Sequence, residues 1–324
     1  MLSVQRQVPR RFRDEEVEVE CVISRKENRD GITKVGLIGC GTMGMCMLNK
    51  LLETGYSVCA YDMSPPALKN AENAGAHVVA SPKEVAINCR VILMSLPGPA
   101  QVEDVVFGID GLFDALTENH IVIDTSTVEP DTTKSVSRRV HEKGVAYLDC
   151  PILGRPSAVG KWMLPSGGNL DALDYVRPVL RTFSAQVVHV GESGAGNAIK
   201  LLNQMMFSAM NSITAEVLAI ADQVGVGRKT FYETVANSEA ATVSGLFKEV
   251  GQKIVQEDYG HPTFTIDLLI KDTKLALQMA ENANAPSVLA RTVQVYNQIA
   301  SANGLGREDT SALYKVYEKH YRKD

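Results

Sequence analysis

The chain has 324 residues, of which 45% are hydrophobic and 22% charged, and its formal net charge at pH 7 is -5. This composition is typical of globular proteins and excludes the collagen-like, disulfide-scaffold and intrinsically disordered classes. The net negative charge argues against a nucleic-acid partner, because the chain has no general basic field with which to displace counterions. At about 100–200 residues per domain, the length allows two domains or one large one.

Cysteine spacing and hydropathy narrow the class further. The six cysteines form no Cys-x-x-Cys pair and show no zinc-like spacing with histidine, so we interpret them as free thiols in a reducing compartment. No apolar run approaches the roughly 20 residues that span a bilayer. We therefore expect an intracellular protein with no metal site and no membrane segment.

Residues 1–30 differ from the rest of the chain and are predicted to be an N-terminal extension. Four arginines precede the first acidic residue, Asp14, and an acidic run follows at 14–20. An arginine-bearing start without acidic residues is typical of a mitochondrial targeting segment, whereas the alternative is a disordered or loosely docked extension. The compartment, cytoplasm or mitochondrial matrix, stays open.

Short apolar runs alternate with helical patterns after this extension. The runs predicted as strands are 34–38, 58–61, 91–94 and 121–123, and the helical patterns between them include 65–73 and 130–143. Continuously apolar strands that alternate with helices are typical of a parallel sheet covered on both faces. We predict an α/β fold, with a doubly wound domain of the Rossmann type over 31–192.

The remainder, 193–324, is predicted to be an all-α domain for substrate binding and dimerisation. Its expected helices are 198–224, 229–236, 242–255, 266–282 and 287–302. The first of these is long enough to join the two domains. Because long apolar helices offer more surface than one domain buries, we expect a homodimer or homotetramer.

A glycine-rich loop follows the first predicted strand and opens a helix. Its glycines, in Gly-x-Gly-x-x-Gly spacing, are Gly39, Gly41 and Gly44. In this strand–turn–helix context they permit a tight turn, close approach of a pyrophosphate and packing of helix on strand. The N–H groups of Thr42 and Met43 would then face the phosphates at the positive end of the helix dipole.

The second predicted strand ends at Asp62, about 20 residues beyond the loop. A carboxylate at this place accepts hydrogen bonds from the adenosine ribose and repels the 2′-phosphate of NADP. The sequence therefore predicts NAD as cofactor, with NADP disfavoured. Two later strand ends, 95–99 and 124–127, belong to the same crevice, because ligands bind at the carboxyl ends of the strands in such sheets.

Lys200 lies near the start of the long helix, behind Gly194 and Gly196. Asn203 follows three residues later and so projects from the same helix face. The setting of Lys200 is apolar and rich in small residues, which lowers the pKa of an ammonium by desolvation and suits proton transfer. A solvated surface lysine is the alternative interpretation.

Five motifs in order resemble those of the β-hydroxyacid dehydrogenases, the family of 3-hydroxyisobutyrate dehydrogenase and tartronate semialdehyde reductase. They are the glycine loop, Leu96-Pro97, Asp124-x-Ser126-Thr127, Gly194-x-Gly196-x-x-x-Lys200-x-x-Asn203, and Phe264-x-Ile266-x-Leu268-x-x-Lys271-Asp272. The resemblance extends from about residue 33 to the C-terminus. It implies a dehydrogenase fold and a nicotinamide cofactor.

The resemblance also implies roles for individual residues. Lys200 matches the catalytic lysine that gives a proton to the carbonyl oxygen during reduction, and Asn203 and Gln204 match the polar pair that holds the substrate. Lys271 matches a lysine that reaches the cofactor from the helical domain. The positions that match the lining of the nicotinamide side are Leu96, Pro97, Gln101 and Thr127. No metal is required.

One segment departs from the family's pattern. Where the family has Asp-Ala-Pro-Val-Ser-Gly-Gly, this chain has Asp-Cys-Pro-Ile-Leu-Gly-Arg at 149–155. The segment resembles a Gly-Arg variant group that includes reductases of sulfolactaldehyde and succinic semialdehyde. We predict that Gly154 and Arg155 bind substrate, since a guanidinium holds a carboxylate or sulfonate through two parallel hydrogen bonds. A surface ion pair is the alternative for Arg155.

These observations predict an NAD-dependent oxidoreductase that interconverts a small 3-hydroxy acid and its semialdehyde. An alternative is a reductase of another acidic aldehyde, of the succinic semialdehyde or sulfolactaldehyde type, anchored by Arg155. A non-catalytic dinucleotide-binding module and an imine reductase are disfavoured, because members of both classes commonly lack the lysine that this chain retains as Lys200.

Overall fold

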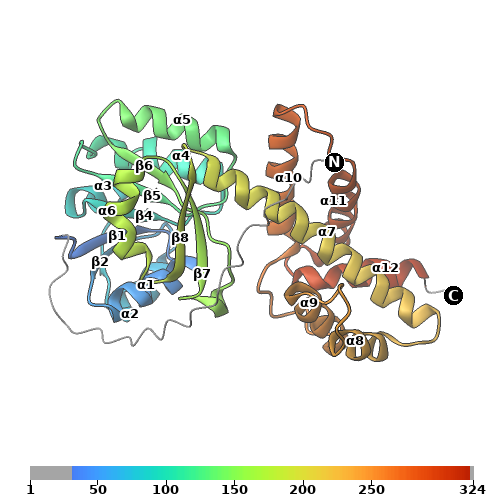
Figure 1. Ribbon diagram of the computed structural model, residues 1–324. Coiled ribbons are helices and arrows are strands. Elements are labelled where there is room, and N and C mark those ends of the chain that lie inside the picture. Colours follow the sequence, from blue (N-terminus) through green and yellow to red (C-terminus); the bar gives the residue numbers. More distant parts are fainter. Residues whose placement is uncertain (1–30, 322–324) are drawn as a thin grey trace, which may run out of the picture. The chain divides into compact units, whose positions relative to one another are not determined.

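A computed structural model describes residues 31–321 and is drawn in Figure 1. The predicted targeting or disordered extension, residues 1–30, lies outside the described residues. The boundaries predicted at residues 30 and 192 stay predictions. Five of the six cysteines are described and all five are free thiols, as expected.

The described residues contain one eight-stranded sheet of order β3-β2-β1-β4-β5-β6-β7-β8. The strands are β1 (Lys34–Ile38), β2 (Ser57–Tyr61), β3 (His77–Val78), β4 (Val91–Met94), β5 (Ile121–Asp124), β6 (Ala146–Asp149), β7 (Trp162–Gly167) and β8 (Ser184–Gly191). Strands β1 to β6 pair in parallel, β7 pairs antiparallel with β6, and β8 is parallel to β7. The predicted parallel sheet is confirmed, and β3 and β6 to β8 are additions to it.

Two apolar cores, one on each face of the sheet, explain why its strands are continuously apolar. Val35 and Leu37 of β1 pack into one core, whereas Ile38 packs into the other. Successive side chains of a strand point to opposite faces, so a strand covered on both sides needs apolar residues at every position. All four residues of β4 are buried accordingly.

Helices cover both faces of this sheet (Figure 1). They are α1 (Thr42–Glu53), α2 (Pro65–Ala74), α3 (Pro82–Asn88), α4 (Pro99–Phe107), α5 (Pro130–His141) and α6 (Leu170–Leu180). Several begin with a proline in the first turn, where the missing N–H costs no hydrogen bond.

The chain is helical after β8, as predicted. The helices are α7 (Ala195–Gln223), α8 (Arg228–Ala236), α9 (Gly245–Gln256), α10 (Ile266–Asn282), α11 (Val288–Ala300) and α12 (Tyr314–Tyr321). A third core, which includes Leu218, Ile254 and Tyr314, joins α7 to the helices packed around it. No described helix has the length and apolar character required to cross a membrane.

Candidate active site

The glycine loop leaves room for a ligand at one of its three positions. A Cβ on Gly39 would lie 2.2 Å from the Ser95 carbonyl oxygen, and a Cβ on Gly44 would lie 1.9 Å from the Gly39 carbonyl oxygen. These two glycines are therefore required by backbone packing. A Cβ on Gly41 would meet nothing within 4 Å. The open space beside Gly41, at the N-terminus of α1, fits the pyrophosphate of a dinucleotide.

Asp62 is held in place at the end of β2 by two backbone N–H groups. Its Oδ2 accepts from the Cys40 N–H at 2.7 Å and its Oδ1 accepts from the Ser64 N–H at 2.8 Å. A carboxylate has about four lone-pair sites, so these contacts leave acceptor capacity for ribose hydroxyls. The loop and the carboxylate thus fit the adenosine half of a nicotinamide dinucleotide.

Side-chain hydrogen bonds join the carboxyl ends of β4 and β5. The Leu96 N–H donates to Ser126 Oγ at 2.9 Å, and the Thr125 hydroxyl donates to the Met94 carbonyl at 2.7 Å. These contacts hold the two loops that follow the strands at one edge of the sheet. Both loops carry residues predicted to line the nicotinamide side.

Lys271 of α10 joins the helical region to these loops. Its Nζ donates to the carbonyl oxygens of Pro97, at 3.0 Å, and Thr127, at 3.3 Å. A Cβ on Gly98 would lie 3.6 Å from Gln101 Oε1 and 3.8 Å from Lys271 Cδ. The structure therefore brings Lys271 together with three of the residues predicted to line the nicotinamide side.

Lys200, on the second turn of α7, donates from Nζ to the Ile152 carbonyl oxygen at 2.9 Å. Burial lowers the pKa of this ammonium below its ordinary value, the nearby Lys271 lowers it further, and Asp272 acts in the opposite direction. No ion pair joins Lys200 to a carboxylate within the described part of the chain. The lysine is thus a desolvated amine held by a neutral acceptor.

Asp272 links α7, which carries Lys200, to α10, which carries Lys271; the sequence motif includes this residue, but no role was predicted for it. Its Oδ2 accepts from Gln204 Nε2 at 2.5 Å, and its Oδ1 lies 2.8 Å from Lys271 Nζ. Gln204 in turn accepts at Oε1 from Asn203 Nδ2 at 3.5 Å, and Asn203 is exposed. Of the predicted polar pair, Gln204 therefore contacts Asp272 directly and Asn203 contacts Gln204. The signal in the sequence was a carboxylate directly after Lys271.

Asp149, the last residue of β6, accepts hydrogen bonds from the start of α7. Its Oδ1 accepts from the Gly194 N–H at 2.8 Å and its Oδ2 accepts from the Asn197 N–H at 2.9 Å. Burial raises the pKa of Asp149 to about 6, although both N–H groups favour the charged form. The neighbouring Asp124, at the paired position of β5, is also buried and accepts from the Tyr147 hydroxyl at 2.8 Å. Sequence reasoning missed Asp149, although it ends an apolar strand as Asp62 does.

The segment 149–155 and helix α7 run side by side in the same direction. Asp149 contacts the helix start, Ile152 contacts Lys200, and the guanidinium of Arg155 lies 5.7 Å from the ring centroid of Phe207. The three contacts thus follow the same order along the segment and along the helix.

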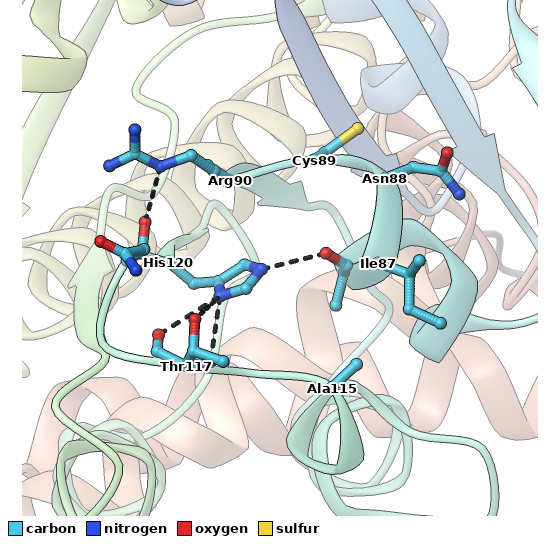
Figure 2. Close-up of a pocket in the computed structure, with 9 residues that line it drawn as sticks. Ile87, Asn88, Cys89, Arg90, Ala115, Thr117 and His120 are labelled. Atoms are coloured by element: carbon cyan, nitrogen blue, oxygen red, sulfur yellow. Dashed lines mark hydrogen bonds between the residues drawn. The ribbon is translucent and has the colours of Figure 1, made fainter.

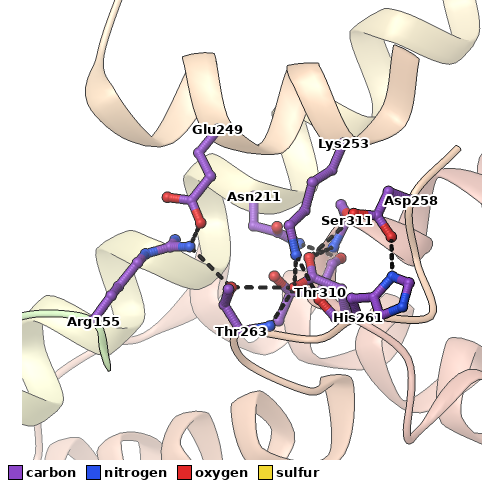
Figure 3. A network of polar contacts seen from close by, with 10 residues as sticks. Arg155, Asn211, Glu249, Lys253, Asp258, His261, Thr263, Thr310 and Ser311 are labelled. Carbon is purple, nitrogen blue, oxygen red and sulfur yellow. Dashed lines mark hydrogen bonds and ion pairs between the residues drawn. The ribbon is translucent and has the colours of Figure 1, made fainter. Parts of the chain in front are cut away.

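Arg155 belongs to a polar network on the helical region (Figure 3). Its Nη1 forms an ion pair with Glu249 of α9 and donates to the Thr263 hydroxyl at 3.1 Å. Gly154 beside it has a packing role, since a Cβ there would lie 2.2 Å from the Trp162 ring. The structure thus places Arg155 along the helix face that carries Lys200, already facing a carboxylate.

A separate recess of about 530 Å³ lies at the amino ends of β4 and β5 (Figure 2). Its histidine, His120, accepts at Nδ1 from the Thr117 N–H at 3.0 Å, and its Nε2 lies 3.0 Å from the Ala86 carbonyl oxygen. Both ring nitrogens therefore have protein partners, and none of the predicted site residues lines the recess. Within the described ranges no group of three or more His, Cys, Asp or Glu side chains is arranged to hold a metal ion.

Comparison with known protein families gives two matches that together span most of the chain. A model of the NAD-binding domain of 6-phosphogluconate dehydrogenase matches residues 34–191. A model described as NAD-binding of NADP-dependent 3-hydroxyisobutyrate dehydrogenase matches residues 194–317. The two matches coincide with the sheet region and the helical region.

Individual proteins match over nearly their whole length. The L-threonate dehydrogenase of Cupriavidus necator is 30% identical over 286 residues, which cover 87% of this chain and 95% of that relative. The 2-(hydroxymethyl)glutarate dehydrogenase of Eubacterium barkeri is 30% identical and covers 88% of this chain and 95% of its own. A crystal structure of 3-hydroxyisobutyrate dehydrogenase from Salmonella typhimurium superposes with a TM-score of 0.79 at 28% identity, covering 87% of this chain and 99% of that one.

Proposed function

Given that this chain belongs to the β-hydroxyacid dehydrogenase family, we propose that it transfers hydride between NAD(H) and a small 3-hydroxy acid or the corresponding semialdehyde. Membership makes it an NAD(P)-dependent oxidoreductase of hydroxy acids. The substrate within that class, the preference for NAD and the roles of individual residues are parts of the proposal.

The observation that carries the proposal is the environment of Lys200. Its ammonium is desolvated, contacts the Ile152 carbonyl, and has its pKa lowered toward the range in which a group both gives and takes a proton. In reduction, Nζ gives a proton to the oxygen that becomes the substrate hydroxyl. In oxidation, the neutral amine takes that proton back.

The surrounding residues orient the two reactants. When bound, the nicotinamide supplies or accepts the hydride. The space beside Gly41 admits the pyrophosphate and Asp62 accepts from the ribose. Lys271, fixed to the loops after β4 and β5, closes the site from the helical region, and Asp272 holds Gln204 toward the substrate.

The preference for NAD over NADP rests on Asp62. The carboxylate stands at the end of β2 with its position fixed by two N–H groups, so it cannot turn away from a 2′-phosphate without losing them. We expect kcat/KM to be at least about tenfold higher with NADH than with NADPH, the cost of roughly one uncompensated charge contact. Equal kcat/KM values with NADH and NADPH would show that Asp62 does not select between the two cofactors.

The test of the proposed activity is NADH oxidation across a panel of semialdehydes and NAD⁺ reduction with the matching hydroxy acids. The proposal requires turnover of at least one such pair in both directions. Absence of turnover throughout the panel, in protein shown to bind NADH by fluorescence, would contradict it.

The alternative substrate is another acidic aldehyde, whose acidic group would bind Arg155. One contact in the structure weighs against it. Arg155 Nη1 already forms an ion pair with Glu249. An anionic group on the substrate must therefore displace Glu249 or share the guanidinium with it. Succinic semialdehyde and sulfolactaldehyde belong in the same panel, where their kcat/KM relative to a hydroxylated substrate distinguishes the two versions.

The proposed homodimer is supported by an apolar stripe along α7. Large apolar side chains exposed on this helix are Ile199, Leu202, Met206, Ile213 and Ile220. Exposed apolar stripes of this kind mark interaction surfaces in soluble proteins. Light scattering at micromolar concentration should give a mass of twice 35.2 kDa or a higher multiple, and a monomer at all concentrations would contradict the proposal.

A further inference from the structure

The neighbourhood of Arg155 contains an arrangement that the proposed reaction does not use. Arg155 extends from its loop toward the helical region, where Glu249 and Thr263 face it (Figure 3). Both contacts are made by Nη1. A guanidinium has five N–H donors in a planar fork, so Nε and Nη2 retain donors for another acceptor.

Glu249 is the carboxylate in direct contact with Arg155, and the nearby Asp309, which is paired with Lys253, also acts on the guanidinium through its charge. Asp309 Oδ2 lies 2.6 Å from Lys253 Nζ and also accepts from the Thr263 N–H at 3.0 Å. The network therefore consists of two pairs, Arg155 with Glu249 and Lys253 with Asp309, whose formal charges cancel. Little positive charge is left over at Arg155.

Arg155 and Glu249 lie farther along α7 than Lys200. The guanidinium of Arg155 lies 5.7 Å from the ring centroid of Phe207, which follows Lys200 by seven residues on α7. Seven residues are about two helical turns, so the two positions lie about 10 Å apart along the axis.

A neutral pair of this kind recognises a hydroxyl group better than an anion. A hydroxyl accepts a hydrogen bond from Arg155 and donates one to Glu249, so both members of the pair are satisfied at once. A carboxylate or sulfonate satisfies the arginine only, and its charge is repelled by Glu249. The pair therefore favours substrates in which the end opposite the reacting carbon carries a hydroxyl group and no charge.

We infer that Arg155 and Glu249 together form a subsite for a hydroxyl-bearing, uncharged substrate end, and that Glu249 is the residue that excludes a second anionic group. The inference rests on the proposed function, because it needs a substrate whose reacting carbon lies at Lys200. The substrate class becomes a hydroxylated monocarboxylic acid.

The experiment compares two hydroxy acids, only one of which carries a second carboxylate. L-Threonate carries one carboxylate and an uncharged hydroxylated end, whereas 2-(hydroxymethyl)glutarate carries a second carboxylate. Affinities are measured by calorimetry on the NADH-loaded protein, in which a hydroxy acid binds but is not oxidised. The same two compounds are assayed for NAD⁺ reduction.

The variant Glu249→Gln keeps the shape and the hydrogen-bonding groups of the side chain and removes its charge. In the unaltered protein we expect L-threonate to bind at least about tenfold more tightly than the dicarboxylate, and in Glu249→Gln we expect that ratio to fall at least about tenfold. The change should appear mainly in binding and KM, with kcat for L-threonate changed less than about threefold.

The matched control is Glu233→Gln, which removes an exposed carboxylate of α8 that pairs with Lys229. It should leave the ratio of affinities unchanged. The inference is overturned if Glu249→Gln leaves the ratio within about twofold of the unaltered protein, or if neither probe binds the NADH-loaded protein. Selective binding of L-threonate without turnover of any compound in the panel would preserve the subsite and contradict the proposed activity, so the two failures are distinguishable.

Discussion

Lys200 on α7 and Arg155 on the adjoining segment 149–155 are two cations with opposite electrostatic surroundings. Lys200 is desolvated and donates to a neutral carbonyl, whereas Arg155 faces the carboxylate of Glu249 directly. Burial lowers the pKa of Lys200, while Arg155, although burial lowers its pKa as well, is a group that stays charged in proteins.

The difference separates reactivity from recognition. An ammonium with no paired carboxylate loses its proton readily, which an acid and base must do in each turnover. A guanidinium held by a counter-ion has a fixed position and a fixed charge state, which suits reading a hydrogen-bonding pattern. The chain thus places its proton-transfer group and its proposed recognition group about two helical turns apart, in different electrostatic settings.

The largest expected effect comes from removing the unpaired cation. Lys200→Ala should lower kcat by about 10³-fold, within the usual contribution of general acid–base catalysis, because no proton is then available at the substrate oxygen. Binding of NADH, measured by fluorescence titration, should stay within a few-fold of the unaltered protein. Near-normal turnover would show that Lys200 is not the acid and base, and would contradict its contrast with Arg155.

The pH profiles of the two reaction directions provide the next test. Reduction needs the ammonium of Lys200 and so should lose rate as pH rises through its pKa, whereas oxidation needs the neutral amine and should gain rate. Each limb changes by about tenfold per pH unit, and both should share a midpoint below 10.5, the ordinary value for lysine.

Lys200→Arg is the control for these profiles. A guanidinium does not titrate in this range, so both limbs should disappear along with the oxidation rate. Limbs that persist in Lys200→Arg would assign the titration to another group.

Removal of the paired cation should affect recognition more than chemistry. Arg155→Ala should raise KM for L-threonate by about 10- to 100-fold, the value of one lost charge-assisted hydrogen bond, with kcat nearly unchanged. For 3-hydroxypropionate, whose only hydroxyl group is the one that reacts, KM should change little. Arg291→Ala, which breaks an exposed ion pair with Glu281, is the control. Equal increases for both substrates would show that Arg155 has no role at the far end.

The smallest expected effect concerns Asp149, which fixes the start of α7. Asp149→Asn turns an amide N–H₂ or a single oxygen toward two N–H donors, and the free energy of unfolding should fall by about 1–3 kcal/mol. Because Lys200 lies within a turn of this anchor, kcat should fall more than KM rises. Asp171→Asn, which changes an exposed carboxylate in the first turn of α6, is the control.

The pH dependence of stability gives an independent check on Asp149. Its folded pKa of about 6 lies above the ordinary 3.8, so the folded state binds the proton more tightly. Its contribution is therefore largest at low pH and is lost as pH rises from about 4 to about 6. Denaturant titrations should show this loss reduced in Asp149→Asn, and an unchanged pH dependence would contradict the assignment.

Much of the sheet was predictable, because a strand covered on both faces is apolar at every position. β1, β2, β4 and β5 have this pattern. β7 and β8 were not predicted. β7 contains a proline, a serine and a glycine, and β8 is partly exposed, so neither gives a continuous apolar signal. The helices after β8 were predictable from their periodicity.

The proposed site was predictable where its residues follow one another in short motifs, as around Gly41 and Lys200. The contacts that set their chemistry join residues far apart in the sequence. Asp149 meets Asn197 across 48 residues, and Glu249 meets Arg155 only because α9 packs against α7. Such pairings depend on how helices pack on each other, which no local pattern records.

The segment 149–155 carries both a contact to the proposed acid–base group and the proposed recognition group. The Ile152 carbonyl oxygen accepts from Lys200 Nζ, and Arg155 follows three residues later, near Phe207 of the same helix. A residue inserted between Ile152 and Arg155 would shift the guanidinium relative to Lys200 while leaving the contact of Lys200 in place. We therefore expect that the number of residues in this short loop changes which substrates bind without any change of the catalytic group.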